Sequence, residues 1–345
     1  MMALNRPCFI IVSPGFPVSE NDTTCLPAQQ QFVRALNRNF PHLQILIVTL
    51  FHPDHDRMYQ WFGNTVLSMG GRSYGKLLRP LLWRRAVKEG IIGAVGLRIE
   101  GVLSLWCSDS AWVGKQLAKR LGVSHKCWIL GQDARVGNWF VRLVRPAAYN
   151  LIALSPFLAA EFEKNYGVRP AHLVRNSVDI HNSAPVAETR DIDILGVGSL
   201  TTLKQWHVLT EVVARLRESL PSIKVWLAGK GPEAEHIRKE IARRHLDGNI
   251  TLAGEVEHRD VLALMQRVKI LLHPSSYEGY SGACLEALHA GCHVVSFTKA
   301  EDHPVRHWHV LRDEKEMTAT CLEICNTRLT FPASLYSVPT KLQAI

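Results

Sequence analysis

Short apolar runs alternate with amphipathic segments along the first half of the chain. The apolar runs are typical of buried strands, and the segments between them have the spacing of apolar residues that favours helices. The predicted strands cover residues 9–12, 44–50, 102–106, 127–130 and 151–154, and the predicted helices cover residues 27–39, 111–121 and 157–166. Strands that alternate with helices form a parallel sheet covered on both faces. The first half therefore predicts one open α/β domain.

The same alternation starts again after a polar stretch. Residues 181–190 contain Pro185 and lack an apolar period, which is typical of a linker. Strands are then predicted at residues 191–198, 224–228, 250–253, 270–273 and 293–297, and helices at residues 206–220, 233–244, 259–267, 282–290 and 314–326. We therefore expect an amino-terminal domain of residues 1–180, a linker of residues 181–190, a carboxyl-terminal domain of residues 191–330 and a tail of residues 331–345. Ligands of such domains bind at the carboxyl ends of the strands, so we expect a cleft between the two sheets.

Composition narrows the class of protein. The chain has 345 residues, of which 47% are hydrophobic and 21% charged, and this usage is typical of a globular protein rather than a disordered chain or a coiled coil. The longest wholly apolar stretch, residues 91–97, is far shorter than the ~20 residues that cross a bilayer. No small-residue cleavage site follows the apolar run at residues 8–12, which is interpreted as a first strand rather than a secretion signal. We expect a cytoplasmic protein.

Cysteines do not indicate a disulfide framework or a metal site. Eight are scattered along the chain, most of them in apolar segments, where a free cysteine behaves as a small hydrophobic residue. The one close pair, Cys321 and Cys325, lacks the spacing of zinc ligands. The sequence therefore predicts no metal.

The positive charge indicates an anionic partner. Lys and Arg outnumber Asp and Glu, giving a formal net charge of +9. Residues 75–88 interleave basic residues with Leu and Trp, which is typical either of a solvated basic face over an apolar stripe or of a weak peripheral contact with an anionic membrane. Pro80 argues against a single helix through this segment. No RNA-binding motif accompanies it, so we expect no nucleic acid.

Two glycine turns follow strands of the second half. The segment Gly229-Lys-Gly231-Pro lies between a strand and a helix, where glycines let backbone N–H groups approach a phosphate. The segment from Gly196 to Lys204 also ends a strand and places a lysine before a helix. Each is also compatible with a simpler role, as a plain turn in the first case and a solvated lysine in the second.

The strongest signal is the segment from Pro274 to Gly291. Glu278 follows an apolar strand, and Glu286 lies eight residues later in a helix whose other residues are small or apolar. A buried acid needs a partner, which a ligand hydroxyl could supply. The free N–H groups at the start of the helix, near Ser281 and Gly282, could hold a phosphate. The alternative is a structural glutamate on a solvated helix face.

These residues resemble the retaining glycosyltransferases of family four. The resemblance is continuous over residues 195–297, and residues 175–179 resemble a further segment of that family. It implies the GT-B architecture, in which two Rossmann-like, doubly wound α/β domains face each other across a cleft. In the first domain only the order of the elements matches. There the resemblance implies that Gly15, which follows the first strand, lies near the donor. The implied activity is transfer of a sugar from a nucleotide-diphosphate sugar to a glycan or lipid-linked glycan, without a cofactor or metal.

The resemblance assigns roles residue by residue. It implies that Glu278 contacts the donor sugar and that Lys204 neutralises the diphosphate. It implies that Glu286 binds the ribose and that the backbone of Val256 meets the base. The remaining donor-binding positions are those of the phosphate turns and of the helix start, namely Gly198, Ser199, Gly231, Tyr280, Ser281 and Gly282.

Two departures from the family keep an alternative open. Ser199 stands where the family usually has arginine, which removes a bidentate phosphate donor. The sequence after residue 297 also lacks the family's long terminal helices, so a non-catalytic GT-B scaffold is the alternative. A nicotinamide-dependent enzyme is disfavoured because the GxGxxG motif is missing.

Gln132 and Asp133 follow a strand, so we expect Asp133 to face the cleft and orient an acceptor hydroxyl.

Overall fold

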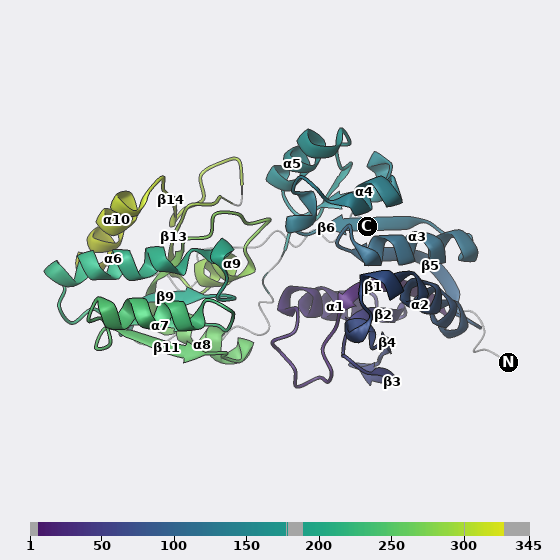
Figure 1. The fold of residues 1–345 in the computed structure, drawn as a ribbon, viewed down its shortest axis with the longest axis horizontal. Coiled ribbons are helices and arrows are strands. Elements are labelled where there is room, and N and C mark those ends of the chain that lie inside the picture. The colour runs from purple at the N-terminus through teal and green to yellow at the C-terminus, as the bar shows by residue number, and fades with distance from the viewer. Residues whose placement is uncertain (1–5, 177, 179–188, 300, 328–345) are drawn as a thin grey trace. The chain divides into compact units, whose positions relative to one another are not determined.

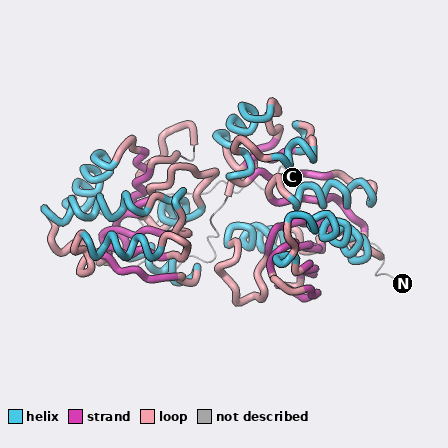
Figure 2. Tube along the Cα trace, in the orientation of Figure 1, coloured by secondary structure: helices cyan, strands magenta, loops and turns pink. Residues whose placement is uncertain are grey.

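The computed structural model describes residues 6–176, 178, 189–299 and 301–327. The chain divides into two compact units, residues 1–176 and 177–345. In each unit helices flank a sheet (Figure 2). The predicted linker, apart from its last two residues, and the predicted tail lie outside the described residues.

The first unit is built on an eight-stranded sheet with the strand order β3-β4-β2-β1-β5-β6-β7-β8 (Figure 1). All neighbouring strands are parallel except β3 and β4, which form an antiparallel hairpin that the sequence analysis did not predict. The strands are β1 (Pro7–Gly15), β2 (Gln44–His52), β3 (Asp56–Trp61), β4 (Asn64–Met69), β5 (Arg98–Leu105), β6 (His125–Ile129), β7 (Leu151–Ala153) and β8 (His172–Leu173). The chain order reverses between β1 and β5, as in a doubly wound sheet.

Five α-helices of the first unit connect these strands. They are α1 (Pro27–Asn39), α2 (Arg79–Gly93), α3 (Asp109–Leu121), α4 (Trp139–Val144) and α5 (Pro156–Tyr166). Residues 75–88 do not form a single helix, as Pro80 indicated: a 3-10 turn over Lys76–Leu78 precedes α2, and Pro80 lies in the first turn of α2, where no intrahelical acceptor is available for an N–H group anyway. Helix α5 has Ser155 as its N-cap and the left-handed Gly167 at its end.

The second unit repeats the plan with a six-stranded parallel sheet in the order β11-β10-β9-β12-β13-β14. The strands are β9 (Ile192–Val197), β10 (Val225–Ala228), β11 (Ile250–Gly254), β12 (Val268–His273), β13 (His293–Ser296) and β14 (Trp308–Val310), and the helices are α6 (Trp206–Ser219), α7 (Ala234–Arg243), α8 (His258–Arg267), α9 (Gly282–His289) and α10 (Glu314–Asn326). The reversal of strand order lies between β9 and β12. Both doubly wound α/β sheets predicted from the sequence are therefore confirmed.

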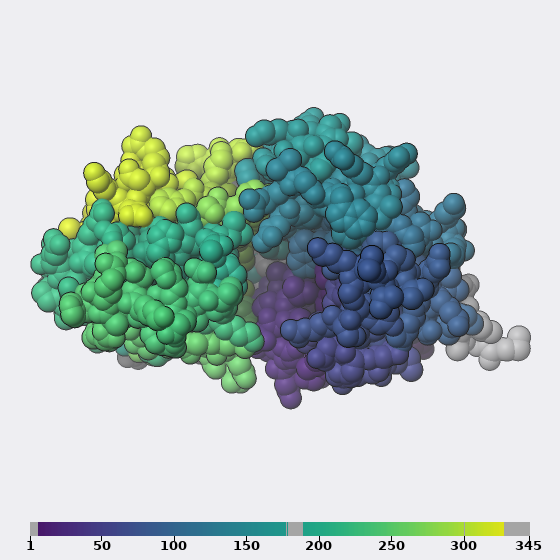
Figure 3. All heavy atoms as spheres, in the orientation of Figure 1, coloured from purple at the N-terminus to yellow at the C-terminus, as the bar shows by residue number. Residues whose placement is uncertain are grey.

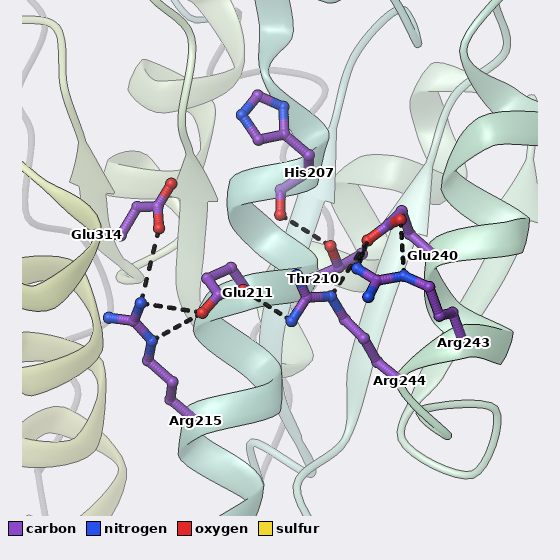
Figure 4. Close-up of polar contacts among 8 residues, drawn as sticks. All are labelled: His207, Thr210, Glu211, Arg215, Glu240, Arg243, Arg244 and Glu314. Carbon is purple, nitrogen blue, oxygen red and sulfur yellow. Dashed lines mark hydrogen bonds and ion pairs between the residues drawn. The ribbon is translucent and has the colours of Figure 1, made fainter.

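Apolar packing and a polar network hold the helices of the second unit together. Buried Ile194, Leu209 and Ile270 belong to a core that extends to residues of α10, and α10 lies against α6 at the surface (Figure 3). Glu211 of α6 pairs with Arg244 at 2.7 Å, and Arg215 of α6 lies 2.9 Å from Glu211 (Figure 4). The same network reaches α7 and α10 through the remaining partners, which are Glu240, Arg243 and Glu314.

No helix in the described part of the chain has the length and apolar character that a bilayer span requires.

Candidate active site

The candidate residues of the second unit gather at one edge of its sheet. Strands β10, β9 and β12 are neighbours and parallel, so the segments that follow their carboxyl ends meet at that edge. These segments are the turn at Gly198, the turn at Gly229 and the loop of residues 274–281 that leads into α9. The loop is tied to the first turn, because Ser276 N donates to Leu203 O at 3.1 Å. The edge lies at the reversal of strand order, where open α/β sheets bind ligands.

The two glycine turns pack backbone against backbone. A Cβ atom on Gly229 would lie 1.8 Å from Gly198 O, and one on Gly231 would lie 2.3 Å from Leu200 O. Both Gly198 and Gly229 also have positive φ angles, which favour glycine. Packing alone therefore requires glycine at positions 229 and 231. Ser199 lies exposed beside this contact, and its carbonyl accepts the Trp206 Nε1–H at 3.0 Å.

Lys204 and Glu278 form the charged centre of the edge. The Lys204 ammonium pairs with Glu278 Oε1, and each side chain is 18% exposed. The same carboxylate oxygen accepts a hydrogen bond from Ser275 Oγ at 2.8 Å and one from His273 Nε2 at 3.0 Å. Neither His273 nor Ser275 was predicted as a site residue, although both stand within five residues of Glu278.

The protonation states of this cluster follow from burial and its partners. Burial by itself raises the pKa of Glu278, but the hydrogen bond from His273 and the positive charge of Lys204 outweigh it and lower the pKa to about 2. Burial lowers the pKa of His273, so that ring is neutral and donates through Nε2. Its buried Nδ1 has no hydrogen-bond partner in the structure. At neutral pH the cluster therefore holds an ionised carboxylate, an ammonium and a neutral imidazole.

Helix α9 begins beside this cluster. Ser281 is its N-cap and accepts Cys284 N–H at 3.4 Å. A Cβ atom on Gly282 would meet no atom within 4 Å, so the space around the start of the helix is open. The Tyr280 side chain is buried and donates its hydroxyl to Glu301 at 2.9 Å. The Tyr280 ring is therefore engaged within the protein and does not face a ligand.

Glu286 has a partner on another helix that was not predicted from the sequence. Its Oε1 lies 2.8 Å from His258 Nε2, and only 12% of its side chain is exposed. Burial lowers the pKa of His258, but the hydrogen bond and charge of Glu286 outweigh it, so the pKa is raised. His258 opens α8 and Val256 lies two residues before it, partly buried. The buried acid is thus satisfied by a histidine that stands 28 residues away in the chain.

Asp133 requires a correction. The sequence placed its carboxylate in an open cleft, whereas the structure buries it in the first unit, where it accepts three backbone N–H groups. Oδ2 accepts Cys107 N–H at 2.8 Å, and Oδ1 accepts those of Gly131 at 2.8 Å and Leu130 at 3.2 Å. Burial raises the pKa of Asp133, and the backbone hydrogen bonds oppose that shift. The carboxylate therefore ties two loops together, while its neighbour Gln132 is exposed.

Gly15 ends β1 in the first unit and is buried.

One cluster of metal-ligand side chains, Asp22, Cys25 and His52, occurs among the described residues, and its ligand atoms all lie within 4.8 Å of one another. Asp22 already accepts backbone N–H groups from Thr24 and Cys25, each at 3.2 Å. This cluster of described residues shares no residue with the donor site predicted from the sequence.

Comparisons with known proteins converge on one family. Residues 179–304 match the model of the glycosyl transferases group 1. Glycogen synthase of Mycobacterium tuberculosis is 26% identical over 181 residues, covering 50% of this chain and 43% of that protein. The lipopolysaccharide core biosynthesis glycosyltransferase LpsE of Rhizobium meliloti is 29% identical over 127 residues, covering 37% of this chain and 33% of that protein. The chain thus spans less than half the length of these curated relatives.

Solved structures share the fold over most of the chain. HepE of Anabaena, in complex with UDP and glucose, has a TM-score of 0.67 at 15% identity and covers 92% of this chain and 90% of its own. Sucrose-phosphate synthase of Thermosynechococcus elongatus has a TM-score of 0.66 at 19% identity, covering 84% and 81%. The two doubly wound units of this chain therefore have the GT-B fold, and the match to the glycosyl transferases group 1 lies in the second of them.

Proposed function

We propose that the protein transfers a sugar from a nucleotide-diphosphate sugar to a glycan or a lipid-linked glycan, with retention of the anomeric configuration and without a metal. The observation that carries this proposal is the pairing of Lys204 with the ionised Glu278 beside the open start of α9. A cation, a hydrogen-bond acceptor and free helix N–H groups are the groups that a sugar linked to a diphosphate needs. The group 1 domain around them supports the assignment.

The diphosphate is assigned to Lys204 and the start of α9. On binding, the phosphate oxygens compete with Glu278 for the Lys204 ammonium, and the N–H groups of Tyr280, Ser281 and Gly282 supply further donors. Gly198, Ser199 and Gly231 lie in the two packed turns, where their backbone can approach the donor, and the contact of Gly15 with the donor stays a prediction from the sequence. Negative charge grows on the diphosphate as the bond to the sugar breaks, so these fixed donors stabilise the transition state.

The sugar and nucleoside are assigned to the two glutamates. Glu278, held by His273 and Ser275, accepts hydrogen bonds from ring hydroxyls. Glu286 accepts hydrogen bonds from the ribose hydroxyls, with His258 fixing its carboxylate, and the backbone of Val256 contacts the base. In the retaining scheme the leaving phosphate helps to deprotonate the acceptor, so no side chain has to act as the principal base.

A peripheral membrane contact fits the first unit. Within residues 75–88, Leu77 is 93% exposed, and Leu78 and Leu81 are also exposed beside Lys76 and Arg84. Exposed leucines among basic residues suit the surface of an anionic bilayer. Similar proteins include the phosphatidylinositol N-acetylglucosaminyltransferase gpi3 subunit of Schizosaccharomyces pombe, which is 26% identical over 127 residues. A lipid-linked acceptor at the cytoplasmic membrane face is the form of the proposal that this surface favours.

Calorimetric titration with UDP-, GDP- and ADP-glucose tests donor binding, and nuclear magnetic resonance of the product tests its anomeric configuration. Transfer that survives EDTA supports metal independence. Ser199→Arg should strengthen donor binding, because a guanidinium returns a bidentate phosphate donor. Binding without transfer to any acceptor or to water would favour the scaffold alternative, and no binding of any nucleotide sugar would refute the proposal.

A further inference from the structure

A cavity of about 600 Å³ lies wholly within the first unit, beside α4 and the end of α5. The two helices lie at the same end of that unit in Figure 1. Its walls come from residues 136–146 and 165–168. None of the donor-site residues assigned above lines it, so a ligand of this cavity is not the donor.

The cavity is positively charged and contains no acid to neutralise it. Arg142 and Arg145 line it, and none of its lining residues is Asp or Glu. Neither guanidinium forms an ion pair with any residue in the described part of the chain, and the one hydrogen bond between the two residues, from Arg145 Nε to Arg142 O, is long at 3.4 Å. Both arginines are exposed, and two such guanidinium groups at one cavity are suited to hold an anion such as a phosphate.

Arg145 adopts a backbone conformation that glycine would adopt at lower cost. It ends α4 with a φ of 47° and donates its N–H to Val141 O at 2.9 Å. This left-handed position after a helix is usually occupied by glycine. Arg145 therefore holds its guanidinium at this position at the cost of local backbone strain.

The remaining polar groups of the wall are already engaged. Asn138 donates to Cys107 O and Asp133 O, at 2.8 and 2.9 Å, and Asn165 donates to Ala134 O at 3.0 Å. Tyr166 accepts Asn138 N–H at 2.9 Å and donates to Arg135 O. These hydrogen bonds fix the wall and leave the two guanidinium groups as the charged groups available to a ligand.

An aromatic platform adjoins the guanidinium groups. Trp139 is 52% exposed, yet its ring is stacked on Phe140 with the ring centroids 4.1 Å apart. Val136 beside it is 81% exposed. A fixed indole face next to an anion site suits a ligand that carries a phosphate together with a sugar ring or a lipid chain.

We propose that this cavity binds the phosphate of a phosphorylated acceptor, with Arg142 and Arg145 on the phosphate and the adjoining part of the acceptor on Trp139. This inference rests on the proposed function, because it names the chemical class of the acceptor. The phosphate belongs either to a lipid-linked glycan or to a soluble sugar phosphate, and the two sources share the same recognition chemistry.

The test uses the full chain and two probes. Glucose 1-phosphate represents a soluble source in calorimetric titration, and vesicles of phosphatidylcholine with one-fifth phosphatidylglycerol represent a lipid source in flotation. Arg142→Gln/Arg145→Gln should weaken binding of whichever probe the wild type binds at least tenfold. The matched control is Lys119→Gln/Arg120→Gln, which removes the same charge from exposed positions of α3 in the same unit and should change binding less than twofold.

Arg145→Gly separates binding from folding. Glycine relieves the left-handed conformation, so the variant should melt at the wild-type temperature or above it while binding the probe at least fivefold more weakly. Binding of glucose 1-phosphate assigns a soluble acceptor. Binding of vesicles alone assigns a lipid acceptor only if Arg142→Gln/Arg145→Gln weakens it, because residues 75–88 would still hold vesicles in that variant.

Three results would overturn the inference: neither probe binds the wild type, the control loses as much affinity as the cavity variant, or Arg145→Gly binds normally. Donor affinity, measured in parallel, should be unchanged in every variant. Loss of the cavity assignment with intact donor binding leaves the proposed function standing, whereas wild type that binds phosphate but no nucleotide sugar contradicts the proposed function instead.

Discussion

Replacing Lys204 with methionine removes the ammonium of the Lys204–Glu278 pair and keeps most of the side-chain volume. Glu278 then retains its hydrogen bonds with His273 and Ser275 but loses the one full positive charge that lies against it. The variant should fold, should bind nucleotide sugar weakly and should hold Glu278 at a higher pKa than the wild type does.

The structure sets the size of these effects. A pKa lowered from 4.5 to about 2 corresponds to about 3 kcal/mol of preference for the ionised form of Glu278. His273 and Lys204 share that preference, so losing the ammonium should destabilise the protein by about 1.5 kcal/mol, the lower end for a charged hydrogen bond. For the donor, loss of a charged contact to the diphosphate worth about 1.5–3 kcal/mol lowers affinity roughly 10- to 150-fold.

The pH dependence provides a second measurement. Because the pKa of Glu278 is lowered in the folded protein, its ionised form stabilises the fold above about pH 4.5, and this stabilisation is lost as the pH falls towards about 2. In Lys204→Met the pKa of the folded protein rises, so the loss should again begin near pH 4.5 but should be smaller and be complete at a higher pH. Differential scanning calorimetry across this range measures both.

The control is Lys239→Met, which removes an exposed lysine from α7 of the same unit and should leave affinity and stability within error of the wild type. Adding Glu278→Gln to Lys204→Met should restore part of the lost stability, because no unpaired carboxylate remains. Nucleotide-sugar affinity that is unchanged in Lys204→Met would refute the assignment of the diphosphate to this edge of the sheet.

Three further substitutions test other parts of the structure. Glu286→Gln should weaken nucleotide binding and lower the pKa of His258, which proton-detected histidine titration measures; an unchanged affinity would make Glu286 purely structural. Asp133→Asn should cost about 1–3 kcal/mol in urea denaturation, because an amide cannot accept all three backbone N–H groups, while donor affinity stays the same. Gly229→Ala should prevent stable folding of the second unit, since its Cβ would lie 1.8 Å from a carbonyl oxygen, whereas Gly248→Ala, with open space around it, should be well tolerated in thermal denaturation.

Most of the fold could be predicted because buried parallel strands and amphipathic helices have different apolar spacing. The segments where prediction failed have local causes. Exposed and half-buried residues alternate in β3, and buried and half-buried residues alternate in β4, each over only six positions, which is too short to stand out. Helix α2 was obscured by Pro80, whose effect depends on whether it stands in the first turn or in the interior.

The candidate site was predicted only in part, because the three-dimensional fold decides which side chains pair with one another. Glu278 and Glu286 could be identified from their chain context, since acids within apolar surroundings need a partner. His258, which pairs with Glu286, stands on another helix, and no spacing along the chain marks it. Asp133 was placed correctly after a strand, but the direction of its carboxylate depends on backbone N–H groups of two separate loops.

The backbone contacts between the glycine turns have a thermodynamic consequence for ligand binding. Leu200 N donates to Lys230 O at 2.9 Å, Gly229 N donates to Gly254 O at 2.7 Å, and Glu233 N donates to Leu200 O at 2.9 Å. Three successive turns are therefore joined by hydrogen bonds within the protein itself. A ligand that enters this edge does not have to order these loops, so more of its interaction energy is available as affinity and selectivity. The heat-capacity change on binding should therefore reflect buried ligand surface rather than loop folding.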